Sequence, residues 1–322
     1  MSATFSGPWK LEPYTISTDA ADVQIANYKQ LSTTDHIAES WEASALPGYL
    51  SKVISGPDCG LSIPQLIEKY GASLLGRRVE ERYGKVFPLL MKVLDCSGDL
   101  TMQVHPADDV AARDFGSIGR EEFWYILDAP EDAEVMSGFT EVLTKEDFIE
   151  KVTDRSIINY VARTPARPGD AFYIPAGRLH TVTPGILILQ ILDPAMSGYD
   201  VFSFDDSRNT TIRSEAEAAA EVVDLTVMPS YRTEPEPTID GIEGLAHTSH
   251  FTANRIAITG RKIFYNYEDT FILYHCIGGA VKIWTDDKSE AVELTRGQSA
   301  LLGASAKRVT FDGNGVVISA QM

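Results

Sequence analysis

The chain has 322 residues, 44% of them hydrophobic, and a formal charge of -18 at pH 7. This length corresponds to about two domains of roughly 150 residues, with enough apolar content for buried cores. The negative field repels polyanions and so argues against nucleic acid or an anionic membrane as a partner. Because no apolar run approaches about 18 residues and the start lacks a signal-peptide pattern, we expect a cytoplasmic protein.

Short segments rich in branched and aromatic residues predict strands in the first two thirds of the chain. They are separated by Gly, Pro, Asp and Ser, as strands are: FPLLMKVLD (87–95), FWYILDA (123–129), DAFYIPA (170–176) and ILILQIL (186–192). This part of the chain therefore predicts an all-β core.

Helical periodicity occurs in three places only, at 62–76, from 144 and from 214. The last two helices are predicted to open with capping boxes, Thr144 with Asp147 and Ser214 with Glu217. We interpret these helices as insertions into a β domain.

A proline-rich stretch at 228–245 follows the third helix and cannot propagate a helix or a sheet, so it predicts a linker. Beyond it, residues 246–322 contain about seven short strand-like runs joined by tight turns. The expected runs are 255–260, 262–267, 271–277, 280–286, 299–305, 308–313 and 315–320. This segment predicts a second, smaller β domain.

A spaced motif suggests a metal site in the first domain. Gly169, Pro175, Gly177 and His180 match G-x5-P-x-G-x2-H, the second signature of the cupin jelly roll. The glycine permits a tight turn into a strand, and the histidine then points into the barrel. The first signature supplies an H-x-H pair, and here MQVHP places Gln103 and His105 on one face of a strand.

The third ligand should be an acid from the next strand, where GREEFWYILD offers Glu121 and Glu122. Strand parity alone does not choose between them. Two imidazoles, one carboxylate and one amide oxygen suit zinc, with manganese, iron or cobalt as alternatives, one ion per chain. The competing interpretation is a solvated strand face bearing Gln103 and His105, with His180 a hydrogen-bonded loop residue.

The motif is degenerate in the second domain. Its counterpart keeps Gly297 but has Gly303, Ser305 and Arg308 in place of Pro, Gly and His, which predicts no metal there. We expect its histidines to be structural or surface residues: His247, His250 and His275. The predicted fold is mainly β, with two cupin-type jelly-roll barrels or sandwiches and helical insertions in the first. The predicted domains are a metal-binding domain at 1–227 and a smaller domain at 246–322, joined by the linker at 228–245.

These residues resemble the type I mannose-6-phosphate isomerases, a family of zinc-dependent cupins. The resemblance rests on ESW (39–41), FPLLMKVLD, LTMQVHPADD, EEFWYILDA, GDAFYIPAGRLH and GILILQI. It implies Glu122 as the acid, and hence the zinc ligands Gln103, His105, Glu122 and His180. It also implies interconversion of mannose 6-phosphate and fructose 6-phosphate, by proton transfer between C1 and C2 through an enediol.

The resemblance extends to groups around the metal. Lys92 matches a lysine that the family directs at the site, Arg120 stands where another lysine is usual, and Thr101 replaces a serine. Arginine and lysine are not equivalent at a proton-transfer site.

Two positions depart more strongly from the family. Gln190 occupies the position of a glutamate, and Asp200 occupies that of an arginine. Gln190 cannot accept a proton, and losing a positioned acid or base typically costs about 10²- to 10⁴-fold in rate. An alternative is a shifted alignment in which Arg208 reaches the site, and Arg178 is a further candidate anion contact.

We therefore expect an aldose–ketose isomerase acting on a sugar phosphate, with activity weakened or redirected by Gln190 and Asp200. The alternative is a non-catalytic, metal-dependent sugar-binding cupin. We expect a monomer or a homodimer.

Overall fold

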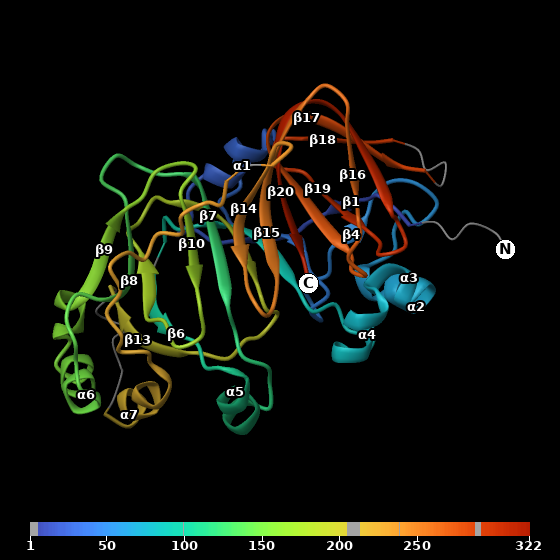
Figure 1. Ribbon diagram of the computed structural model, residues 1–322. Coiled ribbons are helices and arrows are strands. Elements are labelled where there is room, and N and C mark those ends of the chain that lie inside the picture. The colour runs from blue at the N-terminus through green and yellow to red at the C-terminus, as the bar shows by residue number, and fades with distance from the viewer. Residues whose placement is uncertain (1–5, 99, 205–212, 238, 287–290) are drawn as a thin grey trace. The chain divides into compact units, whose positions relative to one another are not determined.

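A computed structural model describes residues 6–98, 100–204, 213–237, 239–286 and 291–322 (Figure 1). Strands predominate among the described residues, which confirms the predicted mainly β fold. The chain divides into two compact units. The first unit comprises Met1–Ile16, Val23–Val93 and Glu234–Met322, and the second comprises Ser17–Asp22 and Leu94–Thr233.

The first unit contains strands from both ends of the chain. Its strands are β1 (Trp9–Glu12), β2 (Tyr14–Ser17), β3 (Ile37–Ala43), β4 (Lys52–Val53), β5 (Leu90–Asp95), β14 (Ile242–His247), β15 (Thr252–Thr259), β16 (Lys262–Tyr265), β17 (Ile272–Thr285), β18 (Val292–Thr295), β19 (Ser299–Leu302) and β20 (Arg308–Gln321). Its helices are α1 (Gln24–Lys29), α2 (Ile63–Tyr70), α3 (Ala72–Leu75) and α4 (Arg77–Tyr83). The last residues of β2 and β5 lie past the boundary of this unit.

One nine-stranded sheet joins the N-terminal strands to the C-terminal ones. The strand order is β14-β15-β20-β17-β19-β1-β4, with β16 paired to β20 and β18 to β17. The pairing of Trp9 with Leu301 shows how distant segments meet. The division into compact units thus places residues 23–93 with the C-terminal segment, whereas the sequence predicts them in the domain 1–227. As independently folding domains, 1–227 and 246–322 stay a prediction.

Two pairs of predicted C-terminal strands are each one long strand. β17 covers the predicted runs 271–277 and 280–286, with a bulge between Cys276 and Gly278. The glycines there look like turn residues in the sequence, but Gly279 has φ +69° and lies where a Cβ would be 2.1 Å from the Asn314 carbonyl oxygen. Glycine therefore permits close packing against β20 here rather than a chain reversal. β20 likewise unites 308–313 with 315–320.

The helix predictions were partly right. α2 and α3 fill the stretch predicted at 62–76, and α6 (Lys145–Thr153) has the predicted capping box of Thr144 and Asp147. The prediction that Ser214 caps the last helix was wrong, because α7 (Arg213–Val222) already includes it. Within the described part of the chain, four helical elements were missed, since each is at most eight residues long and shows little periodicity: α1, α4, α5 and η1.

The predicted linker is held to the protein by specific bonds. The Tyr231 hydroxyl donates to the Phe139 carbonyl at 3.0 Å and accepts from the Phe139 amide at 3.0 Å. β14 begins at Ile242, inside the stretch predicted to be linker. Regular structure therefore resumes within the predicted linker, at Ile242.

The second unit contains two sets of strands. Its strands are β6 (Thr101–Val104), β7 (Glu122–Asp128), β8 (Glu134–Phe139), β9 (Val161–Pro165), β10 (Ala171–Ile174), β11 (His180–Val182), β12 (Leu187–Leu192) and β13 (Tyr199–Ser203). Its helices are α5 (Asp108–Phe115), α6, the 3₁₀ helix η1 (Ser156–Asn159) and α7. One sheet has the order β13-β6-β11-β8-β9, and β10, β7 and β12 pair in that order in another.

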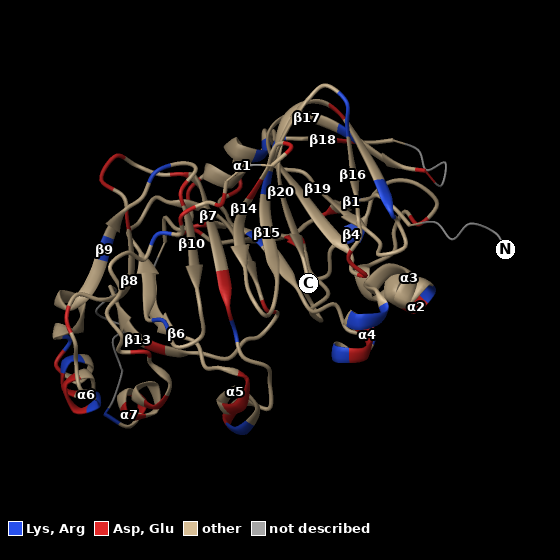
Figure 2. Ribbon diagram, viewed as in Figure 1, with Lys and Arg blue, Asp and Glu red and all other residues tan. Residues whose placement is uncertain are grey.

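Helices α6 and α7 cover one face of the five-stranded sheet, at the left of Figure 1. Met102 and Val104 of β6 point into this core with Phe148 of α6 and Ala219 of α7. Because side chains alternate along a strand, Gln103 points to the opposite face. Acidic residues lie on the outer turns of these helices, where water solvates them (Figure 2).

A buried carboxylate offers a stability test in the first unit. Asp58 accepts hydrogen bonds from the Trp9 indole at 2.7 Å, Lys69 at 2.6 Å and the Tyr70 hydroxyl at 2.8 Å. Burial by itself raises the pKa of Asp58, but these donors outweigh it and hold the pKa below its usual value. A depressed carboxyl pKa stabilises the fold above the unfolded-state pKa, and this stability is lost as the pH falls through the folded-state pKa.

We therefore expect Asp58→Ala to lower the free energy of unfolding by about 1–3 kcal/mol at pH 7, because the buried indole N–H loses its acceptor. The difference from wild type should shrink below roughly pH 4. Urea unfolding at pH 7 and below roughly pH 4 measures this difference in stability. The control is Glu12→Ala, which removes an exposed carboxylate at the end of a strand. An equal loss at both pH values would contradict the ionic origin.

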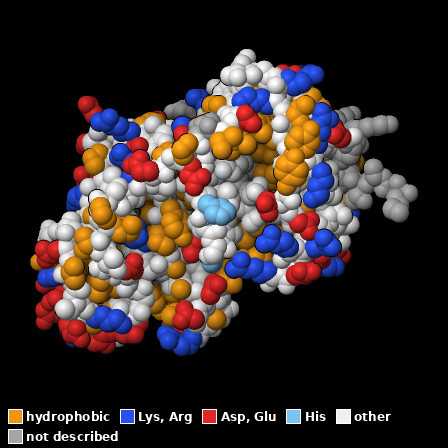
Figure 3. Space-filling model, in the orientation of Figure 1, with side chains coloured by type: hydrophobic (Ala, Val, Ile, Leu, Met, Phe, Trp, Pro, Cys, Tyr) orange, Lys and Arg blue, Asp and Glu red, His pale blue; other side chains and the backbone are white. Residues whose placement is uncertain are grey.

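The surface of the first unit carries an apolar patch over β16, visible as orange side chains in Figure 3. It includes Ile263, Tyr265 and Tyr267, whose side chains are largely exposed, and the two tyrosine rings stack 5.8 Å apart.

Among the described residues, no helix has the length and apolar content needed to cross a lipid bilayer.

Candidate metal centre

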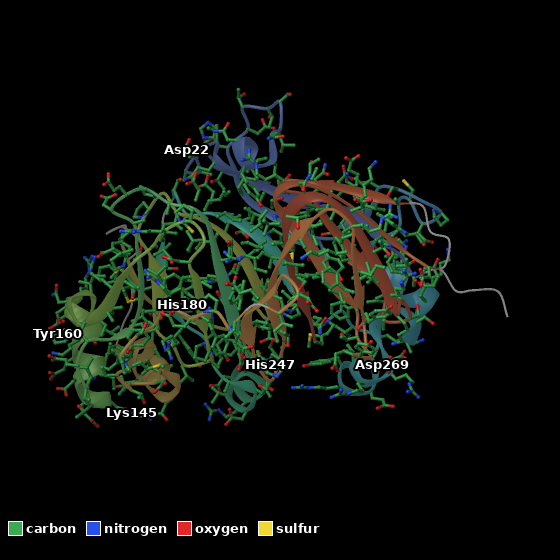
Figure 4. The ribbon with its side chains drawn as sticks, turned by 45° about the horizontal axis from the view of Figure 1, so that its top comes forward. Asp22, Lys145, Tyr160, His180, His247 and Asp269 are labelled. Carbon is green, nitrogen blue, oxygen red and sulfur yellow. The ribbon has the colours of Figure 1, made fainter. Side chains whose placement is uncertain are left out.

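The register of three neighbouring strands aligns the predicted polar residues of the second unit. His180 on β11 lies opposite Gln103 on β6, and Asp200 on β13 lies opposite Gln103 on the other side. Directly opposed residues share one face of a sheet, so these three side chains form a row. His105 follows Gln103 by two positions and lies just beyond the end of β6. Figure 4 shows His180 among the strands of this unit.

Both histidines are held by backbone carbonyls. Nδ1 of His105 lies 2.9 Å from the Ser197 oxygen, and Nδ1 of His180 lies 2.8 Å from the Arg178 oxygen. A carbonyl only accepts, so Nδ1 carries the proton and Nε2 of a neutral ring presents a lone pair. Burial lowers the pKa of His180 to about 4, against the opposing effect of the Glu122 charge. His180 is therefore a neutral imidazole at neutral pH.

The two oxygens of Glu122 have different surroundings. Oε2 accepts hydrogen bonds from the Trp124 indole at 2.7 Å and from the Gln190 side-chain amide. Oε1 lies 2.6 Å from Nε of Arg120 and 3.2 Å from Nε2 of His105. Burial by itself raises the pKa of Glu122, but the Arg120 charge and the neighbouring imidazoles hold it well below its usual value. Glu122 is therefore a buried, ionised carboxylate.

These groups fit a metal ion. The ligand atoms of His105, Glu122 and His180 lie within 4.8 Å of one another, and all three side chains are buried. His105 Nε2 and Glu122 Oε1 make no hydrogen bond, although they lie 3.2 Å apart. Glu122 Oε1 is paired with Arg120, but the Nε2 lone pair of His105 has no hydrogen-bond donor among the described residues and faces this anionic oxygen. A cation among the three ligand atoms would satisfy that lone pair. The donor set of two nitrogens and one oxygen is one that zinc accepts.

The structure separates the two adjacent glutamates. Glu121 accepts a hydrogen bond from the Tyr173 hydroxyl at 2.7 Å, whereas Glu122 joins the two histidines. Neighbouring residues at the start of a strand point to opposite faces, so only one of them can enter the site.

Gln103 stands beside the cluster. Its amide nitrogen donates to the Thr101 hydroxyl at 3.0 Å and to Asp200 Oδ1 at 2.7 Å. Both hydrogens of the amide are thus engaged, and its oxygen is the end that could bind a cation. Thr101 and Asp200 contact a predicted ligand in this arrangement.

The remaining predicted residues lie in other surroundings. Lys92 is on β5 in the first unit, where it pairs with Glu39 at 2.9 Å and lies over the Trp41 ring. The Arg178 guanidinium packs over the Tyr231 ring and contacts the Met228 sulfur, and burial lowers its pKa. Arg208 lies outside the described residues.

Sequence reasoning missed three residues that support the ligands. Trp124 donates to Glu122 and stacks edge-on to His180 with ring centroids 5.3 Å apart. The Ser197 carbonyl orients His105, and Gly198 allows this approach because a Cβ there would lie 2.5 Å from His105 Nδ1. Trp124 could have been found from its position two residues after Glu122 on the same strand face. The Ser197–Gly198 contact has no local sequence signal.

The histidines of the first unit have ordinary structural partners. His275 is buried between the Tyr28 hydroxyl at 2.9 Å and the Ser299 hydroxyl at 2.8 Å, and burial lowers its pKa to about 4. His247 contacts the Thr252 hydroxyl at 3.0 Å and is exposed.

Comparison with known proteins gives consistent matches. The family model "Phosphomannose isomerase type I, catalytic domain" matches residues 15–147. The "Probable mannose-6-phosphate isomerase GmuF" of Bacillus subtilis is 30% identical over 280 residues, which cover 85% of this chain and 86% of the relative. The mannose-6-phosphate isomerase of Streptococcus mutans is 28% identical over 285 residues, 87% of each chain.

Solved structures share the fold along the whole chain. The crystal structure of the mannose 6-phosphate isomerase from Bacillus subtilis has a TM-score of 0.85 and 24% identity, with 99% of this chain and 100% of that chain covered. A phosphomannose isomerase variant from Salmonella typhimurium has a TM-score of 0.83 at 15% identity, with 98% and 99% covered. At these identities the likeness concerns the fold.

Proposed function

This chain belongs to the type I phosphomannose isomerase family, and from that premise we propose that it interconverts mannose 6-phosphate and fructose 6-phosphate. The observation that carries the proposal is the buried cluster of His105, Glu122 and His180, whose lone pairs converge. A sugar phosphate is thus the substrate class that both the family and the site support.

We infer that Gln103, His105, Glu122 and His180 would hold one divalent ion. Zinc suits this mixed N/O set best, with manganese, iron or cobalt as alternatives. A bound ion would act as a Lewis acid on the sugar oxygens that carry developing charge. The protein supplies the rest: carbonyls that orient the imidazoles, and indole and amide donors that hold Glu122.

The chain's own acid–base groups decide the rate. In the second unit Arg120 pairs with Glu122, and an arginine is poorly suited to proton transfer. Gln190 cannot accept a proton, so the position where the family resemblance implies a glutamate holds no base. We therefore expect turnover below that of isomerases with a glutamate at position 190.

A second candidate is a metal-dependent sugar-binding protein without turnover. The observation in its favour is that Gln190 and Asp200 both bond to predicted ligands, Glu122 and Gln103. Position 190 thus holds an amide that cannot transfer a proton, and position 200 holds an anion where the family resemblance implies a cation.

A coupled isomerase assay on metal-analysed protein tests the proposal. Wild type should convert mannose 6-phosphate, lose activity when a chelator removes the metal, and regain it with added zinc. Several other sugar phosphates should be scanned in parallel, because a redirected enzyme would prefer one of them. Calorimetry with the same compounds covers the binding alternative.

Each outcome has a distinct meaning. Turnover that depends on metal supports the isomerase. Sugar-phosphate binding without any turnover by fully loaded protein supports the binder and contradicts the isomerase. Neither binding nor turnover with any of the sugar phosphates would overturn both functions.

A further inference from the structure

The Gln103 side chain has two ends, and only one can bind a cation. The amide oxygen accepts and can coordinate a metal, whereas the amide nitrogen donates only. Which end faces the cluster depends on the partners of the other end. In this structure the nitrogen donates to Thr101 and Asp200, which leaves the oxygen for the site.

Thr101 alone does not set this orientation. Its hydroxyl can donate or accept, so it can pair with either end of the amide. Asp200 is different because a carboxylate only accepts, and an amide oxygen turned toward it would meet a negative charge. The 2.7 Å bond from Nε2 to Asp200 Oδ1 therefore selects one of the two amide orientations.

The strand register makes this selection effective. Asp200 on β13 and His180 on β11 flank Gln103 in the same row, on opposite sides. The end of the amide that turns away from Asp200 is therefore available toward the His180 side. Carboxylates that bond to a metal ligand also fix its orientation and increase its basicity.

We propose that Asp200 is a positioning residue that turns the amide oxygen of Gln103 toward the metal and so secures it as the fourth ligand. This deepens the proposed function and rests on its metal site. An arginine at position 200, the residue that the family resemblance implies, would remove this acceptor and leave Thr101 as the remaining partner of Nε2 in this chain.

Zinc affinity provides the test, measured by competition with a chromophoric chelator on apo-protein at pH 7. Asp200→Arg should weaken zinc binding by about 10- to 100-fold, the usual effect of losing an outer partner of a ligand. Asp200→Asn keeps an acceptor for Nε2 but adds a donor that can pair with the amide oxygen, so its zinc affinity should fall between those of wild type and Asp200→Arg. Asp132→Arg makes the same charge change in an exposed turn of this unit and should have no effect.

A double-mutant cycle separates orientation from long-range charge. In a Gln103→Ala background the amide is gone, so Asp200→Arg should no longer change the zinc affinity. An undiminished effect in that background, or wild-type affinity of Asp200→Arg itself, would overturn the proposal. Unfolding curves of each variant exclude a general loss of fold.

The isomerase assay on wild type keeps the two hypotheses distinct. An active wild type with unchanged zinc affinity in Asp200→Arg would refute the positioning role and leave the function standing. A wild type without turnover, together with the predicted loss of zinc affinity, would refute the isomerase and support the positioning role.

Discussion

His180→Ala should purify almost free of metal and without isomerase activity, whereas wild type should carry about one equivalent of divalent ion per chain. The Nε2 lone pair of His180 belongs to a buried set of three ligand groups, and water cannot replace it with the same geometry. Since losing an outer partner of a ligand already costs about 10- to 100-fold in affinity, losing a ligand should cost more than about 100-fold. His105→Ala should behave in the same way.

Metal analysis of dialysed protein and zinc competition measure this effect. The matched control is His247→Ala, which removes an exposed histidine from β14 of the first unit and should leave metal content unchanged. Circular dichroism and urea unfolding report on the fold of both variants. Full occupancy in folded His105→Ala and His180→Ala would disprove the metal site.

Gln190→Glu should raise kcat/KM for mannose 6-phosphate by about 100-fold, the low end of the contribution of a positioned acid or base. Gln190 is buried on β12 and donates to Glu122, so the new carboxyl would lie beside an ionised one. Two adjacent carboxylates cannot both ionise easily, and the pKa of one is raised. The new group would thus keep a proton to donate to Glu122 and could exchange it with the substrate.

The pH dependence of the rate and of the stability tests whether the new carboxyl acts as an acid or base. The rate of Gln190→Glu should show an added ionisation that wild type lacks. Its stability should fall as the pH rises through the raised pKa, because the folded state must then lose the shared proton. Gln190→Met, which removes the amide without adding an acid, serves as the control and should gain no activity. If metal-loaded Gln190→Glu is no faster than wild type, Gln190 only supports Glu122.

Adding Asp200→Arg to the Gln190→Glu variant should not raise kcat/KM further when zinc is limiting. The sequence alone suggests that restoring both family residues would help, since acid and cation act on one transition state. In the structure, however, the arginine would remove the acceptor that orients Gln103. The benefit of the double change should therefore emerge only at saturating zinc, and the two changes should be non-additive.

Much of the site could be predicted because its chemistry is encoded locally. Gly169 and His180 lie in one motif with fixed spacing, and Gln103 and His105 share a strand face by period two. The mainly β fold likewise follows from short apolar runs between turn residues. Short helices such as α1 and α4 lacked this kind of signal, because seven residues or fewer show too little periodicity.

The sequence by itself determined the type of fold and the family of this protein and singled out the candidate ligand residues, since each depends on neighbours along the chain. The tertiary structure decided the partners of Gln190 and Asp200, which bond to residues 68 and 97 positions away. It also decided that β1 belongs with β19. Strand pairing and the direction of a side-chain amide are set by partners distant in sequence, and no local pattern records them.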